Sequence, residues 1–191
     1  NEMHSYRIGN VFYIRSIPIG AIYPDVRMAV SYRHRLIRQI VEWKPDVIHS
    51  QCEFFSFQFA EYIAKETGAP IVHTYHTLYE QYVNYVLPIK GVGEKAVGKL
   101  SQLRLKHVRC IIAPTRKVEE RLREYGIEVP IAVVPSGIRL EQHEMRFDEQ
   151  QRTEGRKALG IEETDKVLVN IGRLGTEKRV DELLEYFSHV T

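Results

Sequence analysis

Residues 110–134 read CIIAPTRKVEERLREYGIEVPIAVV, and this stretch decides the fold. The apolar run at 110–113 predicts a buried strand, and the helical spacing at 116–125 predicts a helix with Thr115 as its N-cap. A glycine ends that helix, and a proline then favours extended backbone before the apolar run at 131–134. Strand, helix and strand in this order indicate a βαβ unit and therefore a parallel sheet.

The same alternation recurs on both sides of this stretch. Further apolar runs predict strands at 11–16, 46–49, 71–75 and 167–171. Apolar residues at helical spacing predict helices at 28–43, 56–66 and 180–187. The pattern is typical of an α/β protein with a doubly wound parallel sheet.

A polar segment at 139–165 separates two parts of the chain. It is rich in Glu, Gln, Arg, Met and His, with a brief helical pattern at 156–159, which is typical of a connector. We therefore expect one domain at 1–138 and the opening strand, turn and helix of a second domain at 166–191. Because the chain starts at Asn1 without Met, we expect it to be a segment of a longer protein.

Composition narrows the classes of function. The 191 residues include 27 Lys and Arg against 25 Asp and Glu, a balance that argues against nucleic acid as a partner. Cys52 and Cys110 show neither CxxC spacing nor a neighbouring histidine pair, so we expect reduced thiols in the cytosol and no metal site. No apolar run reaches the 18 residues that predict a membrane span.

The turn at 172–178, Gly-Arg-Leu-Gly-Thr-Glu-Lys, carries the clearest chemical signal. It leads from an apolar run into a helix, and helix N-termini attract anions through unpaired N–H groups and the macrodipole. Arg173 and Lys178 add two positive charges to the same turn. The turn therefore predicts a phosphate-binding site that includes Gly172.

Three loops follow predicted parallel strands, at the edge where open α/β sheets bind ligands. They carry Glu53, His76, and the pair Ser136 and Gly137. His76 lies beyond its strand and His73 within it, so His76 is the better candidate for binding a ligand. Two simpler readings stay open here: a hydrogen-bonded loop histidine and an ordinary turn at 135–138. Neither histidine has the spacing or the partners of a metal ligand.

The segment at 90–109 predicts a basic amphipathic helix. Four cations fall within about 80° of one another on a helical wheel: Lys95, Lys99, Lys106 and Arg109. Ala96, Leu100 and Leu103 share a neighbouring face. Just upstream, an aromatic stripe at helical spacing comprises Tyr79, Tyr82, Val83 and Val86. Together the two features suit an anionic membrane, and the alternative is a solvated helix whose stripe packs on the sheet.

Taken together, these residues resemble the retaining glycosyltransferases of family 4, which have the GT-B fold of two facing Rossmann-like domains. The resemblance covers nearly the whole chain and is most specific at 73–77, 113–115, 135–138 and 172–178. The run at 71–82, IVHTYHTLYEQY, looks especially like the branch that glucosylates diacylglycerol, the bacterial 1,2-diacylglycerol 3-glucosyltransferases.

The resemblance implies a role for each candidate. Arg173 and Lys178 would hold the diphosphate of a nucleotide-sugar, expected to be UDP-glucose, and His76 would be the catalytic residue that hydrogen-bonds a hydroxyl of the donor sugar. No cofactor or metal is implied, because these cations neutralise the diphosphate. The acceptor would be a membrane lipid, expected to be diacylglycerol. That acceptor implies a cytoplasmic protein bound peripherally to an anionic membrane surface, the inner face of the cell membrane.

The chain also departs from the family pattern. The family's first strand and glycine-rich loop are absent, as is a pair of donor-binding glutamates, and Arg139 stands where many relatives have Asp. We therefore expect the 191-residue chain by itself not to turn over substrate. Two alternatives remain: a family 4 enzyme with a soluble or polysaccharide acceptor, and a non-catalytic nucleotide-binding or interaction module. The oligomeric state stays open.

Overall fold

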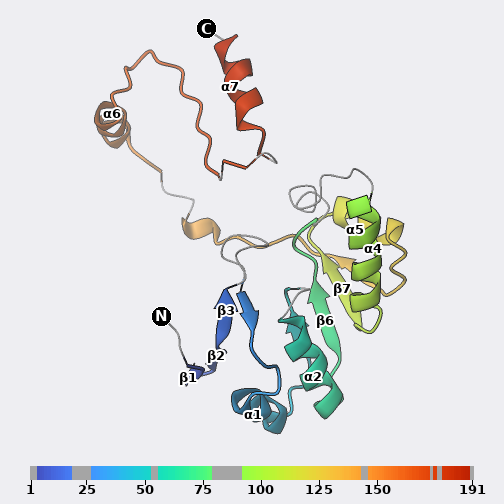
Figure 1. Cartoon of the computed structure of the whole chain (residues 1–191). Coiled ribbons are helices and arrows are strands. Elements are labelled where there is room, and N and C mark those ends of the chain that lie inside the picture. Colours follow the sequence, from blue (N-terminus) through green and yellow to red (C-terminus); the bar gives the residue numbers. More distant parts are fainter. Residues whose placement is uncertain are drawn as a thin grey trace. The chain divides into compact units, whose positions relative to one another are not determined.

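The computed structural model describes residues 4–18, 27–52, 56–78, 92–142, 146–172, 174–175 and 178–189, with side chains for all of these except 92–95 and 142. The chain divides into two compact units, unit 1 at 1–136 and unit 2 at 137–191, and each is described by itself (Figure 1). The domain assignment made from the sequence stays a prediction.

Within the described ranges of unit 1, four strands form a parallel sheet in the order β5-β6-β7-β8 (Figure 1). These strands are β5 (Ile48–Ser50), β6 (Ile71–Thr74), β7 (Cys110–Ala113) and β8 (Ile131–Val133). The helices around them are α1 (Arg35–Trp43), α2 (Phe57–Thr67), α4 (Val92–Leu105) and α5 (Arg116–Glu124). The sequence predicted all four of these strands, and the parallel βαβ arrangement is confirmed, with small shifts of the strand ends.

The core lies between this sheet and the helices that connect its strands. Fully buried residues include Phe57 at the start of α2, Ile111 in β7, Leu105 at the end of α4 and Leu122 in α5. The local signals for α5 are confirmed as well, since the hydroxyl of Thr115 accepts a hydrogen bond from the N–H of Val118 at 3.3 Å.

The predicted strand at 11–16 is wrong in part, because it is split between two short strands and neither joins the parallel sheet. Four short strands form two antiparallel pairs here: β1 (Tyr6–Ile8) with β2 (Val11–Tyr13), and β3 (Ser16–Pro18) with β4 (Arg27–Ala29). Ile8 pairs with Val11 across Gly9 and Asn10, and Gly9 has a φ of +55°, which glycine adopts without steric cost. A two-residue turn of this kind between short apolar runs is the hairpin signal that the parallel interpretation missed.

The predicted helix at 28–43 is too long. α1 begins only at Arg35, because Met28 and Ala29, at the start of the predicted helix, belong to β4 and pair with β3. His34 is the N-cap: its Nδ1 atom accepts a hydrogen bond from the N–H of Leu36 at 3.2 Å. Strand pairing with a distant partner therefore overrode the helical spacing at the start of this segment.

The predicted strand at 167–171 is also wrong. The described residues of unit 2 contain no strand, and its helices are η1 (Leu140–Gln142), α6 (Glu149–Ala158) and α7 (Val180–Ser188). Val169 is 76% exposed and Ile171 is 92% exposed. A strand needs neighbours that take its backbone N–H and C=O groups, and the described part of unit 2 supplies none.

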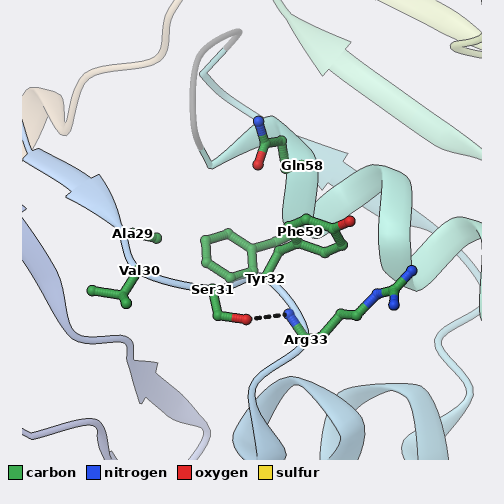
Figure 2. Close-up of a pocket in the computed structure, with 7 residues that line it drawn as sticks. All are labelled: Ala29, Val30, Ser31, Tyr32, Arg33, Gln58 and Phe59. Atoms are coloured by element: carbon green, nitrogen blue, oxygen red, sulfur yellow. Dashed lines mark hydrogen bonds between the residues drawn. The ribbon is translucent and has the colours of Figure 1, made fainter.

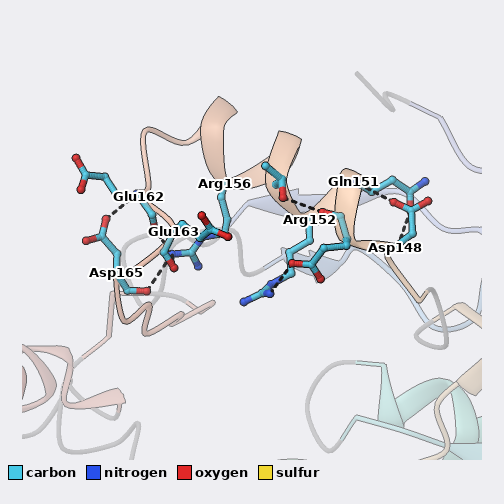
Figure 3. A network of polar contacts seen from close by, with 9 residues as sticks. Asp148, Gln151, Arg152, Arg156, Glu162, Glu163 and Asp165 are labelled. Carbon is cyan, nitrogen blue, oxygen red and sulfur yellow. Dashed lines mark hydrogen bonds and ion pairs between the residues drawn. The ribbon is translucent and has the colours of Figure 1, made fainter.

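The predicted helix at 156–159 is longer than expected, because α6 begins at Glu149 with a capping box that the sequence analysis missed. The carboxylate of Asp148 accepts from the N–H of Gln151 at 2.7 Å, and the Gln151 side chain accepts from the N–H of Asp148 at 3.1 Å. Figure 3 shows this box and the turn that follows the helix. The Asp-x-x-Gln spacing could have located the start of the helix from sequence.

Arg156 on α6 holds the turn at 161–165. Its guanidinium donates to the backbone carbonyls of Glu162, Glu163 and Asp165, and the carboxylate of Asp165 accepts from the N–H of Glu162 at 2.7 Å (Figure 3). One half-buried side chain therefore donates to three backbone carbonyl groups of this turn.

We expect Arg156→Ala to lower the free energy of unfolding of unit 2 by about 1–3 kcal/mol, because the carbonyls lose a charged donor. Hydrogen exchange of the amides at 161–165 measures this, and exchange should become faster there. The control is Arg152→Ala, whose guanidinium pairs with the exposed carboxylate of Glu149 and should change little. Equal exchange rates in the two variants would contradict the role of Arg156.

Candidate active site

The carboxyl ends of β5 to β8 meet at one edge of the sheet, because the strands are parallel. His76 lies at this edge, two residues after the end of β6, and it is exposed. The residue before it, Tyr75, is fully buried, and its hydroxyl lies 3.2 Å from the Oγ atom of Ser101 on α4. The backbone that carries His76 is thus held in place by the buried side chain of Tyr75.

Two side-chain hydrogen bonds join the ends of β5 and β6. The Nε2 atom of His76 lies 3.1 Å from the Oε1 atom of Gln51, in the loop after β5. One step closer to the sheet centre, the Nε2 atom of His49 lies 2.7 Å from the Oγ1 atom of Thr74. The sequence analysis did not single out Gln51, and its position two residues after His49 was the available signal.

His73 is a core residue. It is fully buried, and its ring packs edge-on against Phe57, with centroids 5.5 Å apart, and against Tyr75 at 6.4 Å. Alternation along β6 explains the difference between the two histidines, because a strand residue facing the core cannot also face a ligand at the open edge. Of the two histidines, His76 is therefore the one that can reach a ligand.

The other loop candidates lie at the same edge or outside the described residues. Ser136 and Gly137 follow β8, and both are exposed; Ser136 is the last residue of unit 1 and Gly137 the first of unit 2. Glu53 lies outside the described residues.

The predicted phosphate turn lies in unit 2, before α7. Gly172 and Lys178 are exposed, and Arg173 lies outside the described residues. The N–H of Lys178 donates to the carbonyl of Gly175 at 2.9 Å, and the side chain of Lys178 is exposed. An exposed cation at this position can contact an anionic ligand without first breaking a described ion pair.

Arg179 caps α7 rather than extending the cationic turn. It adopts a left-handed backbone with a φ of +48°, and its Nε atom donates to the carboxylate of Glu182 at 2.6 Å. Two acidic residues, Asp181 and Glu182, occupy the first turn of the helix. These carboxylates already interact with the positive end of the helix dipole, so anion binding at this turn depends on the cationic side chains.

The predicted basic face of the 90–109 segment is wrong in part. α4 ends at Leu105, so Lys106 and Arg109 lie in the turn before β7 rather than on the helix, although both are exposed. Lys99 is exposed on α4 itself, and the side chain of Lys95 lies outside the described residues. The helix ends before Lys106 and Arg109 because the chain enters β7 at this point. The N–H of Arg109 already donates a hydrogen bond to the carbonyl of Ile71 at 2.7 Å.

The apolar residues of α4 divide between two faces, whereas the aromatic stripe at 79–86 lies outside the described residues. Leu100 is 50% exposed and Leu103 is 53% exposed, and Ala96 is exposed as well. The face that packs on unit 1 carries Val97, Gly98, Ser101 and Leu105. α4 thus has one small-residue face toward the protein and a second, leucine-bearing face toward solvent.

A cavity of about 340 Å³ lies between the segment after β4 and the first turn of α2 (Figure 2). Its lining is Ala29, Val30, Ser31, Tyr32, Arg33, Gln58 and Phe59. The Arg33 guanidinium lies 5.7 Å from the centroid of the Tyr32 ring, and the Arg33 N–H donates to Ser31 Oγ at 3.2 Å. The sequence analysis missed this cavity, because its two walls come from segments far apart in the chain.

No three His, Cys, Asp or Glu side chains of the described residues converge as metal ligands would. Among the described helices, none combines the length and the apolar character that crossing a bilayer requires.

Comparison with known proteins places these features in context. The chain is 30% identical to alpha-monoglucosyldiacylglycerol synthase of Streptococcus pneumoniae, over 99% of the chain and 43% of that protein. It is 27% identical to the synthase of the same name from Acholeplasma laidlawii, over 83% of the chain and 41% of that protein. It is also 28% identical to D-inositol 3-phosphate glycosyltransferase of Geodermatophilus obscurus, over 81% of the chain and 34% of that protein. The chain thus spans less than half the length of these relatives.

The model of Glycosyltransferase Family 4 matches residues 2–142, which is well over half of the chain. This region holds the parallel sheet, His76 and α4. The match and the sheet confirm the Rossmann-like α/β fold expected of a GT-B fragment. The chain therefore belongs to glycosyltransferase family 4.

Proposed function

We propose that this chain is part of a retaining hexosyltransferase that transfers glucose from UDP-glucose to diacylglycerol at a membrane surface. The observation that carries the proposal is the solvent-facing side of α4, where two leucines lie beside a lysine on the unit that presents His76. The similarity to two alpha-monoglucosyldiacylglycerol synthases supports the same acceptor class.

The donor diphosphate binds at the turn before α7. Lys178 and Arg173 neutralise the negative charge that grows on the diphosphate as its bond to the sugar breaks. Cationic side chains suffice for this task, so the proposal includes no metal and no cofactor. The exposed position of Lys178 supports it, because the ammonium group is available to an incoming anion.

The sugar is held by His76 at the sheet edge. A hydrogen bond from one sugar hydroxyl to the imidazole fixes the sugar relative to its leaving group, which lowers the entropic part of the barrier. The lipid hydroxyl then attacks from the face that the diphosphate leaves, and the diphosphate accepts the proton of that hydroxyl. This route retains the configuration without the carboxylate nucleophile that retaining glycoside hydrolases use.

The acceptor reaches this site from a bilayer on which α4 docks. Leu100 and Leu103 insert at the level of the lipid headgroups, while Lys99 and Lys106 interact with anionic headgroups, each worth about 1 kcal/mol near the surface. The contact between Ser101 and Tyr75 connects this helix to the residue next to His76. Docking through α4 therefore brings the bilayer to the helix that contacts Tyr75, the residue next to His76.

We expect Leu100→Ser combined with Leu103→Ser to weaken binding of the full-length protein to anionic vesicles at least about tenfold, because two half-exposed leucines lose their transfer into the interface. Vesicle co-sedimentation measures this. The control is Leu159→Ser, which changes an exposed leucine in unit 2 outside this surface. Unchanged binding by the double variant would contradict docking through α4.

Incubation of the full-length protein with a panel of nucleotide-sugars and lipid acceptors tests the proposed reaction. Product masses should show one glucose added to diacylglycerol when UDP-glucose is the donor. Transfer to a water-soluble acceptor without lipid would favour the second candidate function, which the similarity to D-inositol 3-phosphate glycosyltransferase supports. Binding of UDP-glucose with neither transfer nor hydrolysis would favour a non-catalytic nucleotide-binding module.

A further inference from the structure

The two hydrogen bonds between β5 and β6 form a short ladder that ends at His76. His49 and Gln51 are two residues apart on one chain segment, and Thr74 and His76 are two residues apart on the next. Ser50 and His73 are partners in the parallel register, so the ladder runs along neighbouring strands. Its inner bond is partly buried and its outer bond is exposed. These two hydrogen bonds thus connect the exposed side chain of His76 to the ordered ends of β5 and β6.

The outer bond restricts the protonation pattern of the imidazole. The Gln51 amide is oriented with its Oε1 atom toward His76, and in this orientation the oxygen can only accept, so the Nε2 atom of His76 carries the hydrogen. In a neutral imidazole, the other nitrogen, Nδ1, then has a free lone pair. A hydroxyl group of a ligand suits this nitrogen best, because its O–H donates a hydrogen bond to the lone pair of Nδ1.

We propose that Gln51 is a positioning residue that holds His76 in the Nε2–H tautomer, so that Nδ1 accepts a hydrogen bond from a hydroxyl of the donor sugar. This inference rests on the proposed function for the identity of the hydroxyl, but not for the tautomer. Gln51 acts only through His76 and touches no substrate. It thereby determines whether His76 accepts or donates toward the sugar.

Histidine ¹⁵N NMR of the full chain, at a pH where the ring is neutral, tests the tautomer directly. We expect Nε2 of His76 to be protonated and Nδ1 to be unprotonated. Gln51→Met keeps the length of the side chain but removes the acceptor, and should give a mixture of tautomers. Gln51→Glu restores an acceptor oxygen and should restore the single tautomer. The control is Gln39→Met, which changes an exposed glutamine on α1.

Two results would overturn the proposal: a wild-type His76 protonated mainly at Nδ1, which shows the amide in the opposite orientation, or a Gln51→Met spectrum identical to wild type. The wild-type spectrum is decisive even if the Met variant fails to fold. The readout needs no substrate, so it stays interpretable if the full-length protein transfers no sugar, which would refute the proposed function alone.

Kinetics of the full-length protein give the second test. Gln51→Met should lower kcat about three- to tenfold, the range of one lost hydrogen bond, and Gln51→Glu should recover most of the loss. The KM for the lipid acceptor should stay the same, because Gln51 acts on the sugar side. A Glu variant no better than the Met variant would contradict positioning through an acceptor oxygen.

Discussion

Lys178→Ala should lower the kcat/KM of the full-length protein for its nucleotide-sugar by about 10²- to 10³-fold, the effect of removing one donor that stabilises charge in a transition state. The physical reason is that Lys178 is exposed at the end of the turn and has no ion pair among the described residues, so it is available to a diphosphate. Steady-state transfer rates at varied donor concentration measure the change. Lys178→Arg keeps the charge and should retain a larger part of the activity.

The control for this prediction is Lys166→Ala, because Lys166 is exposed in the same unit and lies before the apolar run rather than in the turn. It should leave kcat/KM unchanged. Calorimetric titration with UDP separates binding from chemistry, since the diphosphate contact should be lost in the Lys178 variant already in the ground state. Equal activity of the two alanine variants would exclude the turn as the diphosphate site.

His76→Ala should lower kcat by about 10²-fold, the cost of a misplaced reacting group. UDP binding should stay near the wild-type level, because the imidazole contacts the sugar and the nucleotide is held in the turn before α7. This split between kcat and nucleotide affinity distinguishes a sugar-binding histidine from one that only stabilises its loop. Transfer rates and UDP titration together measure it.

His107→Ala is the matched control, because His107 is an exposed histidine of unit 1 that precedes β7, at the opposite end of the strands from His76. It should change neither kcat nor UDP affinity. A normal kcat in the His76→Ala variant would show that the sugar does not bind at the ladder. The cavity lined by Arg33 and Gln58 would then be the next candidate.

α4 shows what a helical pattern can and cannot predict. The spacing of Leu100 and Leu103 correctly indicated one face, but not whether that face meets the protein or the solvent. The packed face instead contains Gly98, which lies so close to Tyr125 that an added Cβ atom would be 2.8 Å from the Tyr125 ring. Close approach to a residue 27 positions away decided which face is buried, and no local pattern contains that information.

The apolar run at 167–171 shows a second limit. Its composition is that of a buried strand, yet Ile171 is 92% exposed here. Strand formation depends on partners that can lie anywhere in a sequence, whereas helices α5 and α6 are stabilised by caps within their own segments. Local signals therefore predicted the helices of this chain more reliably than its first and last strands.

The sequence by itself determined the βαβ order of 46–134, the turn residues that end its helices, the choice of His76 over His73, and the cationic turn at 172–178. These depend on period, capping and backbone preference, which act over a few residues. Only the tertiary structure decided that Gln51 contacts His76, that α4 turns its leucines outward, and that β1 to β4 pair in two antiparallel ribbons. Each of these depends on contacts between separate segments, which form only when the sheet and helices pack.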